Sequence, residues 1–152
     1  MFGITRYLAV IVMVLVISQG LIYAATYYVD VTNGNNDYDG LSPLTAWRTI
    51  GKANQELQAG DTVYIREGTY KETIRPTNSG SPGNYITYMS YPGEEATITG
   101  VTDGVNLNER SFIVIDGLRI ISVGSHGITV YNAHYKYNTG LLFRGCPILG
   151  YD

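Results

Sequence analysis

Cysteine is nearly absent from this sequence, which contains only Cys146. A lone cysteine cannot form an internal disulfide, so we expect a small buried apolar side chain rather than a reactive thiol. Basic residues are also few: ten lysines and arginines stand against thirteen acidic residues, and no segment concentrates them. A nucleic-acid-binding surface needs such a cluster, so no nucleic-acid partner is expected. The apolar fraction of 45% is that of a folded protein.

The N-terminal segment 1–24 carries one charge, Arg6, followed by an apolar run over Tyr7–Ile17. A basic start, an apolar centre and the small residue Ala24 are typical of a signal peptide cleaved after Ala24. Cleavage after Ala25 is less favourable because it places Tyr23 three positions before the new terminus. The alternative is an uncleaved anchor, although a membrane span needs about 20 apolar residues. The remainder is therefore predicted to be secreted and free of the membrane, or held at the cell surface if the segment is retained.

One segment has helical periodicity. Four apolar residues recur at spacings of three, three and four and so share one helical face: Trp47, Ile50, Ala53 and Leu57. Thr45 is a candidate N-cap and Gly60 a candidate left-handed C-cap residue, which predicts a helix over 46–59. No second helix is indicated, so the βαβ units of a doubly wound α/β sheet are excluded.

Short strand candidates fill the rest of the chain, separated by turns rich in Gly, Asn, Asp and Pro. They are residues 26–31, 62–66, 72–75, 85–91, 96–99, 111–115, 118–123 and 128–131. A β-sandwich and a coiled solenoid both fit this pattern. Val63, Ile86 and Ile113 occupy similar strands at intervals of roughly 25 residues, a period that is typical of stacked coils.

Two stretches carry a resemblance to a known family: TYYVDVTNGNNDYDGLSPLTAWRTIGKANQELQAGDTVYIREGTYKETI and SGSPGNYITYMSYPGEEATITG. They resemble the start of secreted right-handed parallel β-helix proteins, such as the polysaccharide lyases of the pectate lyase and chondroitinase B kind. The resemblance implies an all-β fold, a single-stranded right-handed parallel β-helix of few rungs with an N-terminal capping α-helix, over residues 25–133. The helix would close the open end of the coil, and Val63 and Ile65 would point inward.

Enzymes of this kind act in a groove outside later rungs, where carboxylate-bound calcium neutralises a uronic acid and a Lys or Arg removes the adjacent proton. The matching positions would lie beyond Asp152, so no catalytic, cofactor-binding or metal-binding residue is assigned, and calcium is expected only in longer relatives. Residues 134–152 lose the strand alternation, which predicts an irregular tail produced by truncation. The leading hypothesis is an N-terminal fragment of a polysaccharide-processing protein, inactive by itself. The alternative is a non-enzymatic scaffold that binds a glycan or another partner.

Five local groups are weighed as candidate sites, each against an ordinary structural role. Asn35–Gly40 partly imitates a calcium loop but has Ala46 where the twelfth-position Glu belongs, so a turn is predicted. The adjacent pair Glu94-Glu95 follows a turn and is predicted to be solvated. One further spacing matches no standard zinc set, that of His126, His134 and Cys146.

Basic and aromatic side chains supply the last two groups. An outer groove could be lined by Arg119, Lys136 and Arg144, although ordinary surface placement is expected. Sugar-stacking faces could come from Tyr85, Tyr88 and Tyr91, for which strand propensity and packing are the preferred explanation.

Overall fold

The computed structural model describes residues 24–99, 102–121, 126–129, 142–146 and 148–149. The expected signal peptide, residues 1–24, lies outside this part except for Ala24. Short strands dominate: β1 (Thr26–Val29), β2 (Thr62–Ile65), β3 (Gly68–Tyr70), β4 (Ile86–Ser90), β5 (Ala96–Ile98), β6 (Asp103–Asn106), β7 (Ile113–Asp116), β8 (Arg119–Ile121), β9 (His126–Thr129), β10 (Leu142–Arg144) and β11 (Ile148–Leu149). The remaining elements are the 3-10 turn η1 (Pro43–Thr45) and the helix α2 (Ile50–Glu56).

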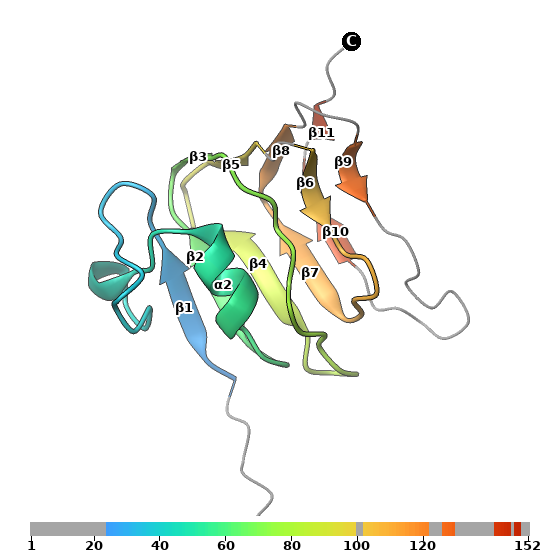
Figure 1. Ribbon diagram of the computed structural model, residues 1–152, viewed down its shortest axis with the longest axis horizontal. Helices are drawn as coiled ribbons and strands as arrows, with labels where there is room; N and C mark the ends of the chain where they lie inside the picture. The colour runs from blue at the N-terminus through green and yellow to red at the C-terminus, as the bar shows by residue number, and fades with distance from the viewer. Residues whose placement is uncertain (1–23, 100–101, 122–125, 130–141, 147, 150–152) are drawn as a thin grey trace, which may run out of the picture.

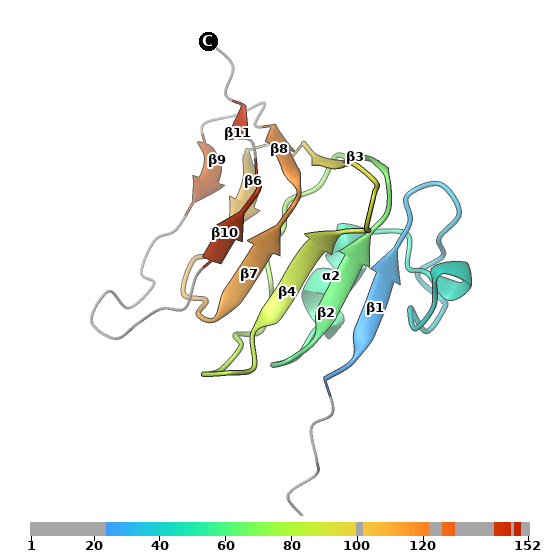
Figure 2. The ribbon, with the colours of Figure 1, turned by 180° about the vertical axis from the view of Figure 1, so that it is seen from behind.

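The strands form three parallel sheets. The largest has the order β1-β2-β4-β7-β10, the second β11-β8-β5-β3, and the third pairs β6 with β9 (Figures 1 and 2). From β4 onward, successive strands enter the three sheets in turn, and every ladder between the described strands is parallel. This arrangement is a parallel β-helix, so the predicted solenoid is confirmed and the β-sandwich is excluded.

Each coil returns the chain to the equivalent position of the large sheet. Thr62 of β2 pairs with Thr87 of β4, and Thr87 pairs in turn with Val114 of β7. The corner between β2 and β3 is made by Gly68, which has a φ of 140° and leaves no room for a side chain: a Cβ there would lie 2.7 Å from Val31 Cγ1. The need for glycine at position 68 thus fixes where the chain passes from the large sheet to the second sheet.

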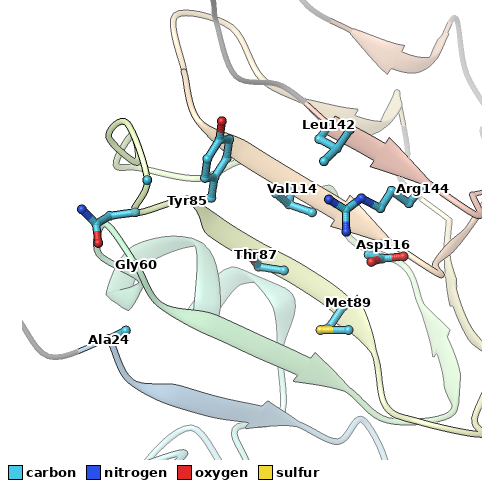
Figure 3. A pocket seen from close by; sticks show the side chains of 11 residues that line it. Ala24, Gly60, Tyr85, Thr87, Met89, Val114, Asp116, Leu142 and Arg144 are labelled. Atoms are coloured by element: carbon cyan, nitrogen blue, oxygen red, sulfur yellow. The ribbon is translucent and has the colours of Figure 1, made fainter.

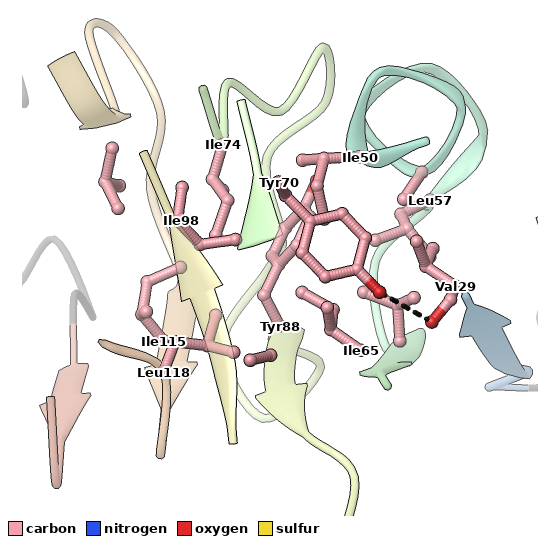
Figure 4. Packing of buried hydrophobic residues seen from close by; sticks show 14 of the residues in the cluster. Val29, Ile50, Leu57, Ile65, Tyr70, Ile74, Tyr88, Ile98, Ile115 and Leu118 are labelled. Carbon is pink, nitrogen blue, oxygen red and sulfur yellow. Dashed lines mark hydrogen bonds between the residues drawn. The ribbon is translucent and has the colours of Figure 1, made fainter. Parts of the chain in front are cut away.

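The core is a continuous column of aliphatic and aromatic side chains inside the coil (Figure 4). Val63 and Ile65 are fully buried in it, as their alternation predicts. Tyr70 is 1% exposed, and its hydroxyl lies 3.0 Å from the carbonyl oxygen of Arg66 and 3.3 Å from that of Val29. This hydroxyl therefore ties the first rung to the edge strand β1 without leaving a buried polar atom unsatisfied.

Helix α2 closes the core at its β1 end, as expected, but begins later than the sequence indicates. Thr49, not Thr45, is the N-cap, and its hydroxyl accepts a hydrogen bond from the Lys52 amide at 3.1 Å. Trp47 precedes the helix because its backbone extends the sheet instead: its N–H donates to the Tyr28 carbonyl at 2.9 Å.

The end of the helix also differs in detail from the expectation. The C-cap is Leu57, whose amide donates to the Ala53 carbonyl at 3.1 Å. Gly60 has the predicted left-handed φ, 98°, but it lies in the turn into β2 rather than directly after the helix.

Asn54 of α2 joins the helix to the first rung. Its amide group donates to the carbonyl of Thr73 at 3.0 Å, and its side-chain oxygen accepts from the Arg75 amide at 3.0 Å and the Tyr88 hydroxyl at 3.1 Å. Asn54 is 9% exposed and Tyr88 is fully buried. A single amide side chain thus satisfies three groups that would otherwise be buried without partners.

Four described strands were not expected from the sequence, and one expected strand does not form. β3 and β6 include Gly68 and Gly104, which the sequence pattern marks as breaks, whereas in the expected strand 72–75 only Ile74 pairs, through an isolated bridge to Val105. In the segment 134–152, expected to be irregular, β10 pairs with β7 and β11 with β8. In the described part of the chain, no helix has the length and apolar character needed to cross a bilayer.

Candidate functional site: the outer groove of the large sheet

The outward side chains of the large sheet form two rows, because parallel pairing in register stacks equivalent positions of successive coils. One row consists of Thr26, Thr62, Thr87, Val114 and Leu142. The other consists of Tyr28, Tyr64, Met89, Asp116 and Arg144. The first three strands thus present uncharged side chains, whereas charge enters only on β7 and β10.

A groove of about 570 Å³ lies over this outer face (Figure 3). Its floor comes from β4, β7 and β10, and one wall comes from the turn before β4 and from the residues before β1 and β2. The described residues that line it are Ala24, Gly60, Gly83, Asn84, Tyr85, Thr87, Met89, Val114, Asp116, Leu142 and Arg144. The groove therefore follows the stacking direction of the coil, as an extended polymer would require.

Asp116 and Arg144 are the charged side chains among these residues. They are register partners on β7 and β10, and their side chains lie next to each other in the groove (Figure 3). Within the described part of the chain, neither charged group has an ion-pair partner. A guanidinium binds carboxylates through two parallel hydrogen bonds, and a carboxylate accepts hydrogen bonds from hydroxyl groups. The pair can therefore recognise an acidic sugar.

The described residues do not fit a calcium site. No group of three or more His, Cys, Asp or Glu side chains among them could hold a metal ion. In the groove, Asp116 is the one described carboxylate, whereas calcium takes six to eight oxygen ligands.

The three tyrosines weighed as a sugar platform do not share one surface. Tyr88 points into the core and is fully buried, which raises the pKa of its hydroxyl. Tyr85 lines the groove and packs edge-on against Phe112, with ring centroids 5.8 Å apart. Tyr91 joins a different cluster and lies 5.8 Å from Tyr64 between ring centroids. Of the three, Tyr85 is the aromatic side chain available to a ligand in the groove.

Glu94 of the pair Glu94-Glu95 is largely covered and ion-paired, which corrects the expectation for that residue, whereas the side chain of Glu95 is 70% exposed. Arg66 bonds Glu94 through Nε and Nη2 at 2.8 to 2.9 Å, and its guanidinium lies 5.0 Å from the ring centre of Tyr91. Glu95 meets Arg119 at 3.3 Å. This second pair belongs to the β5 and β8 side of the coil, so Arg119 does not line the groove.

Acid is expected to weaken the fold partly through Glu94. Arg66 holds the pKa of the Glu94 carboxyl below its ordinary value, against the opposing effect of burial. A lowered folded-state pKa contributes stability above the unfolded value, about 4.3, and that contribution is lost as the pH falls through the folded value. In urea unfolding across pH 3 to 7 (roughly the range of carboxyl titration), Glu94→Gln should lower stability at neutral pH and flatten its loss in acid. An identical acid sensitivity in both proteins would contradict this role.

The loop Asn35–Gly40 and Cys146 have local contacts that are typical of a structural role rather than of a binding site. In Asn35–Gly40, the side-chain oxygens of Asn35 and Asp39 each accept a hydrogen bond of 3.0 Å from the backbone amide two residues later, which is the geometry of a turn. Burial raises the pKa of the Cys146 thiol, in keeping with a packed rather than reactive cysteine. His134 and Lys136 lie outside the described residues, as does the side chain of His126.

Sequence reasoning identified Arg144 as a candidate for a groove but missed Asp116. The expected strands 111–115 and 118–123 leave Asp116-Gly117 as the turn between them, whereas Asp116 ends β7 with its side chain in the groove. The interval from Asp116 to Arg144 is one full coil, and this spacing could have revealed the pair. Recognising this spacing requires knowing the register between β7 and β10, and the apolar period defines that register only roughly.

Two curated proteins are similar to this chain in sequence. The uncharacterized protein YwoF of Bacillus subtilis is 35% identical over 112 residues, which are 67% of this chain and 24% of that protein. Alpha-1,3-galactosidase A of Akkermansia muciniphila is 29% identical over 89 residues, 55% of this chain and 15% of that protein. The chain thus spans about a quarter of YwoF and less of the galactosidase.

A solved structure shows the same fold at low identity. The GH136 lacto-N-biosidase of Eubacterium ramulus aligns with a TM-score of 0.61 and 14% identity, over 82% of this chain and 27% of that one. The family model described as Pel9A-like, right-handed beta helix region, matches residues 27–146. With the three parallel sheets and the capping helix, this match shows that the chain belongs to the Pel9A-like right-handed β-helix family.

Proposed function

We propose that this chain forms the N-terminal cap and first rungs of a secreted β-helix protein that acts on polysaccharides, and that its outer groove binds an acidic sugar chain. The observation that carries the proposal is the Asp116–Arg144 pair on the groove floor, with no ion-pair partner in the described residues. The family and the galactosidase relative support a carbohydrate as the ligand.

Binding without catalysis fits the described groove best. Glycoside hydrolysis ordinarily requires two carboxyl groups flanking the scissile bond, and the described lining has one. Removal of a proton next to a uronate carboxylate requires a strong positive charge to stabilise the enolate. Arg144 alone supplies one positive charge, which suffices to bind a uronate. We therefore propose that the rungs described here are inactive by themselves.

Replacing Arg144 by alanine should weaken binding of polygalacturonate. A charge-assisted hydrogen bond contributes about 1.5 to 3 kcal/mol, so Kd should rise roughly tenfold to a hundredfold. Isothermal titration of the exported chain with oligogalacturonate would measure this. Arg119→Ala is the matched control, because it removes the same charge from the β8 side of the coil and should leave Kd close to that of the wild type. Equal losses in both variants would contradict a groove-specific site.

Catalysis can be tested on the same material. Incubation with polygalacturonate and calcium should produce no absorbance from new unsaturated sugar ends. A robust signal would contradict the proposed inactivity while leaving groove binding intact.

A second candidate is a non-enzymatic scaffold that presents this face to a partner. It is favoured by the uncharged outward rows of β1, β2 and β4, which consist of Thr26, Thr62, Thr87, Tyr28, Tyr64 and Met89. If neutral and acidic oligosaccharides bind with equal affinity, and Arg144→Ala changes neither, the scaffold is the better description.

A further inference from the structure

Asp61 is a buried carboxylate at the start of the first rung. It is 3% exposed, and its two oxygens accept hydrogen bonds of 2.8 Å from the backbone nitrogens of Ala25 and Gln58. Among the described residues, no Lys or Arg side chain forms an ion pair with it. Two backbone N–H groups stabilise the ionised carboxylate, and a cation beside it would add the charge partner that buried carboxylates ordinarily have.

One of the two residues that bond the Asp61 carboxylate, Ala25, is also the first residue after the expected signal-peptide cut. Ala24 is exposed, whereas Ala25 is half-buried and leads directly into β1. The Ala25 carbonyl oxygen accepts a hydrogen bond from the Thr62 amide at 2.9 Å, so both backbone groups of Ala25 are bound to the start of the first rung. The chain therefore becomes tightly held at Ala25.

We propose that the Ala24–Ala25 peptide bond is a processing site and that the new α-ammonium group of Ala25 is the cationic partner of Asp61. A signal peptidase would catalyse the hydrolysis: the hydroxyl of water adds to the Ala24 carbonyl carbon, and its proton goes to the Ala25 nitrogen. A further solvent proton then gives the ammonium form. Since this nitrogen already lies 2.8 Å from Asp61 Oδ1, the existing hydrogen bond becomes charge-assisted in place.

The surroundings of Asp61 favour a cation at this position. Burial, followed by the charges of Asp61 and Glu56, raises the pKa of the nearby Tyr27 hydroxyl. Glu56 is bound by Lys52 at 2.7 Å, on the exposed side of α2, so that lysine is engaged away from Asp61. The α-ammonium group would compensate the carboxylate of Asp61, which has no cation among the described side chains.

The neighbouring cut does not fit the same geometry. Cleavage after Ala25 would remove the donor to Asp61 and the acceptor for the Thr62 amide together. The Asp61 carboxylate and the Thr62 amide would each lose a hydrogen-bond partner, which would lower the stability of the fold. Cleavage after Ala24 therefore keeps both hydrogen bonds of Ala25, whereas cleavage after Ala25 removes them.

The cut is tested by exporting the full chain from a bacterial host and determining its N-terminus by intact mass and Edman sequencing. The proposal predicts a mature protein beginning at Ala25. A protein that begins at Thr26, at an earlier residue or at Met1 would overturn it.

The ion pair is tested on the exported protein by following the α-amino group through its titration with NMR. With Asp61 in contact, this group should be at least about tenfold harder to deprotonate than a free peptide terminus, whose ordinary pKa is about 8. Asp61→Asn should abolish that difference, because asparagine keeps the size of the side chain but removes its charge. If Asp61→Asn does not fold, the wild-type titration alone decides, and an ordinary value would overturn the pairing.

Discussion

Replacing Trp47 by alanine should lower the free energy of unfolding by about 3–5 kcal/mol, the range for truncating a buried aromatic side chain. Trp47 is 3% exposed and stacks on Tyr27 with ring centroids 4.6 Å apart. Its indole nitrogen donates to the Tyr38 carbonyl at 3.0 Å. The substitution would open a cavity beneath the loop that covers the β1 edge and leave that carbonyl without its donor. Urea unfolding followed by circular dichroism would measure the change.

Leu44 provides the matched control for Trp47. It is also apolar and lies three residues earlier, but it is 91% exposed. Leu44→Ala should change the free energy of unfolding by less than about 0.5 kcal/mol. A loss of under about 1 kcal/mol for Trp47→Ala would mean that the Trp47 loop does not seal this end of the coil.

Asn54→Ala should cost about 2–4 kcal/mol, since it leaves several buried polar groups without a partner. The affected groups are the Thr73 carbonyl, the Arg75 amide and the Tyr88 hydroxyl. Tyr88→Phe removes only one of these bonds and should cost about 1 kcal/mol. Thermal and urea unfolding of both variants would establish the order.

The neighbouring Gln55 tests whether the Asn54 effect is specific. Gln55 is exposed on the same helix, so Gln55→Ala removes an amide group without uncovering a buried partner. It should be neutral within about 0.5 kcal/mol. If Asn54→Ala is equally neutral, the helix is not joined to the first rung in the way the contacts indicate.

The capping helix and the inward side chains of the first rung were predictable because they depend on local signals, whereas the choice of a coil over a sandwich depended on the family resemblance. Alternation placed Val63 and Ile65 inside, and the apolar face that includes Ile50 and Leu57 marked the capping helix. The helix start was not predictable from periodicity alone. Trp47 shares the helical spacing, but its backbone bonds across to β1, a tertiary contact that outweighs local preference.

The register could be predicted only roughly. Val63 and Ile86 look equivalent in the apolar pattern, yet Val63 pairs with Tyr88. Coil length varies because each turn has its own loop, so an apolar period alone gives the wrong partner by two positions. For the same reason β10 was not predicted from the sequence. Its pairing with β7 places Arg144 beside Asp116 in the groove.

The candidate site depended on that register. Arg144 could be named from the sequence as a basic side chain near the end, but Asp116 became its neighbour only once β7 and β10 were aligned. Tyr85 and Tyr88 are close in the sequence but do not share a surface. Their spacing of three places them on opposite faces of one strand region, so one lines the groove and the other enters the core.

We propose that the outer face of the large sheet binds an acidic sugar chain. The most direct test is a titration of the exported, isotope-labelled protein with oligogalacturonate, followed by amide NMR. Shifts should concentrate at the floor of the groove, on Thr87, Val114, Asp116 and Arg144. Shifts confined to β5 and β8, or none at millimolar ligand, would contradict the claim.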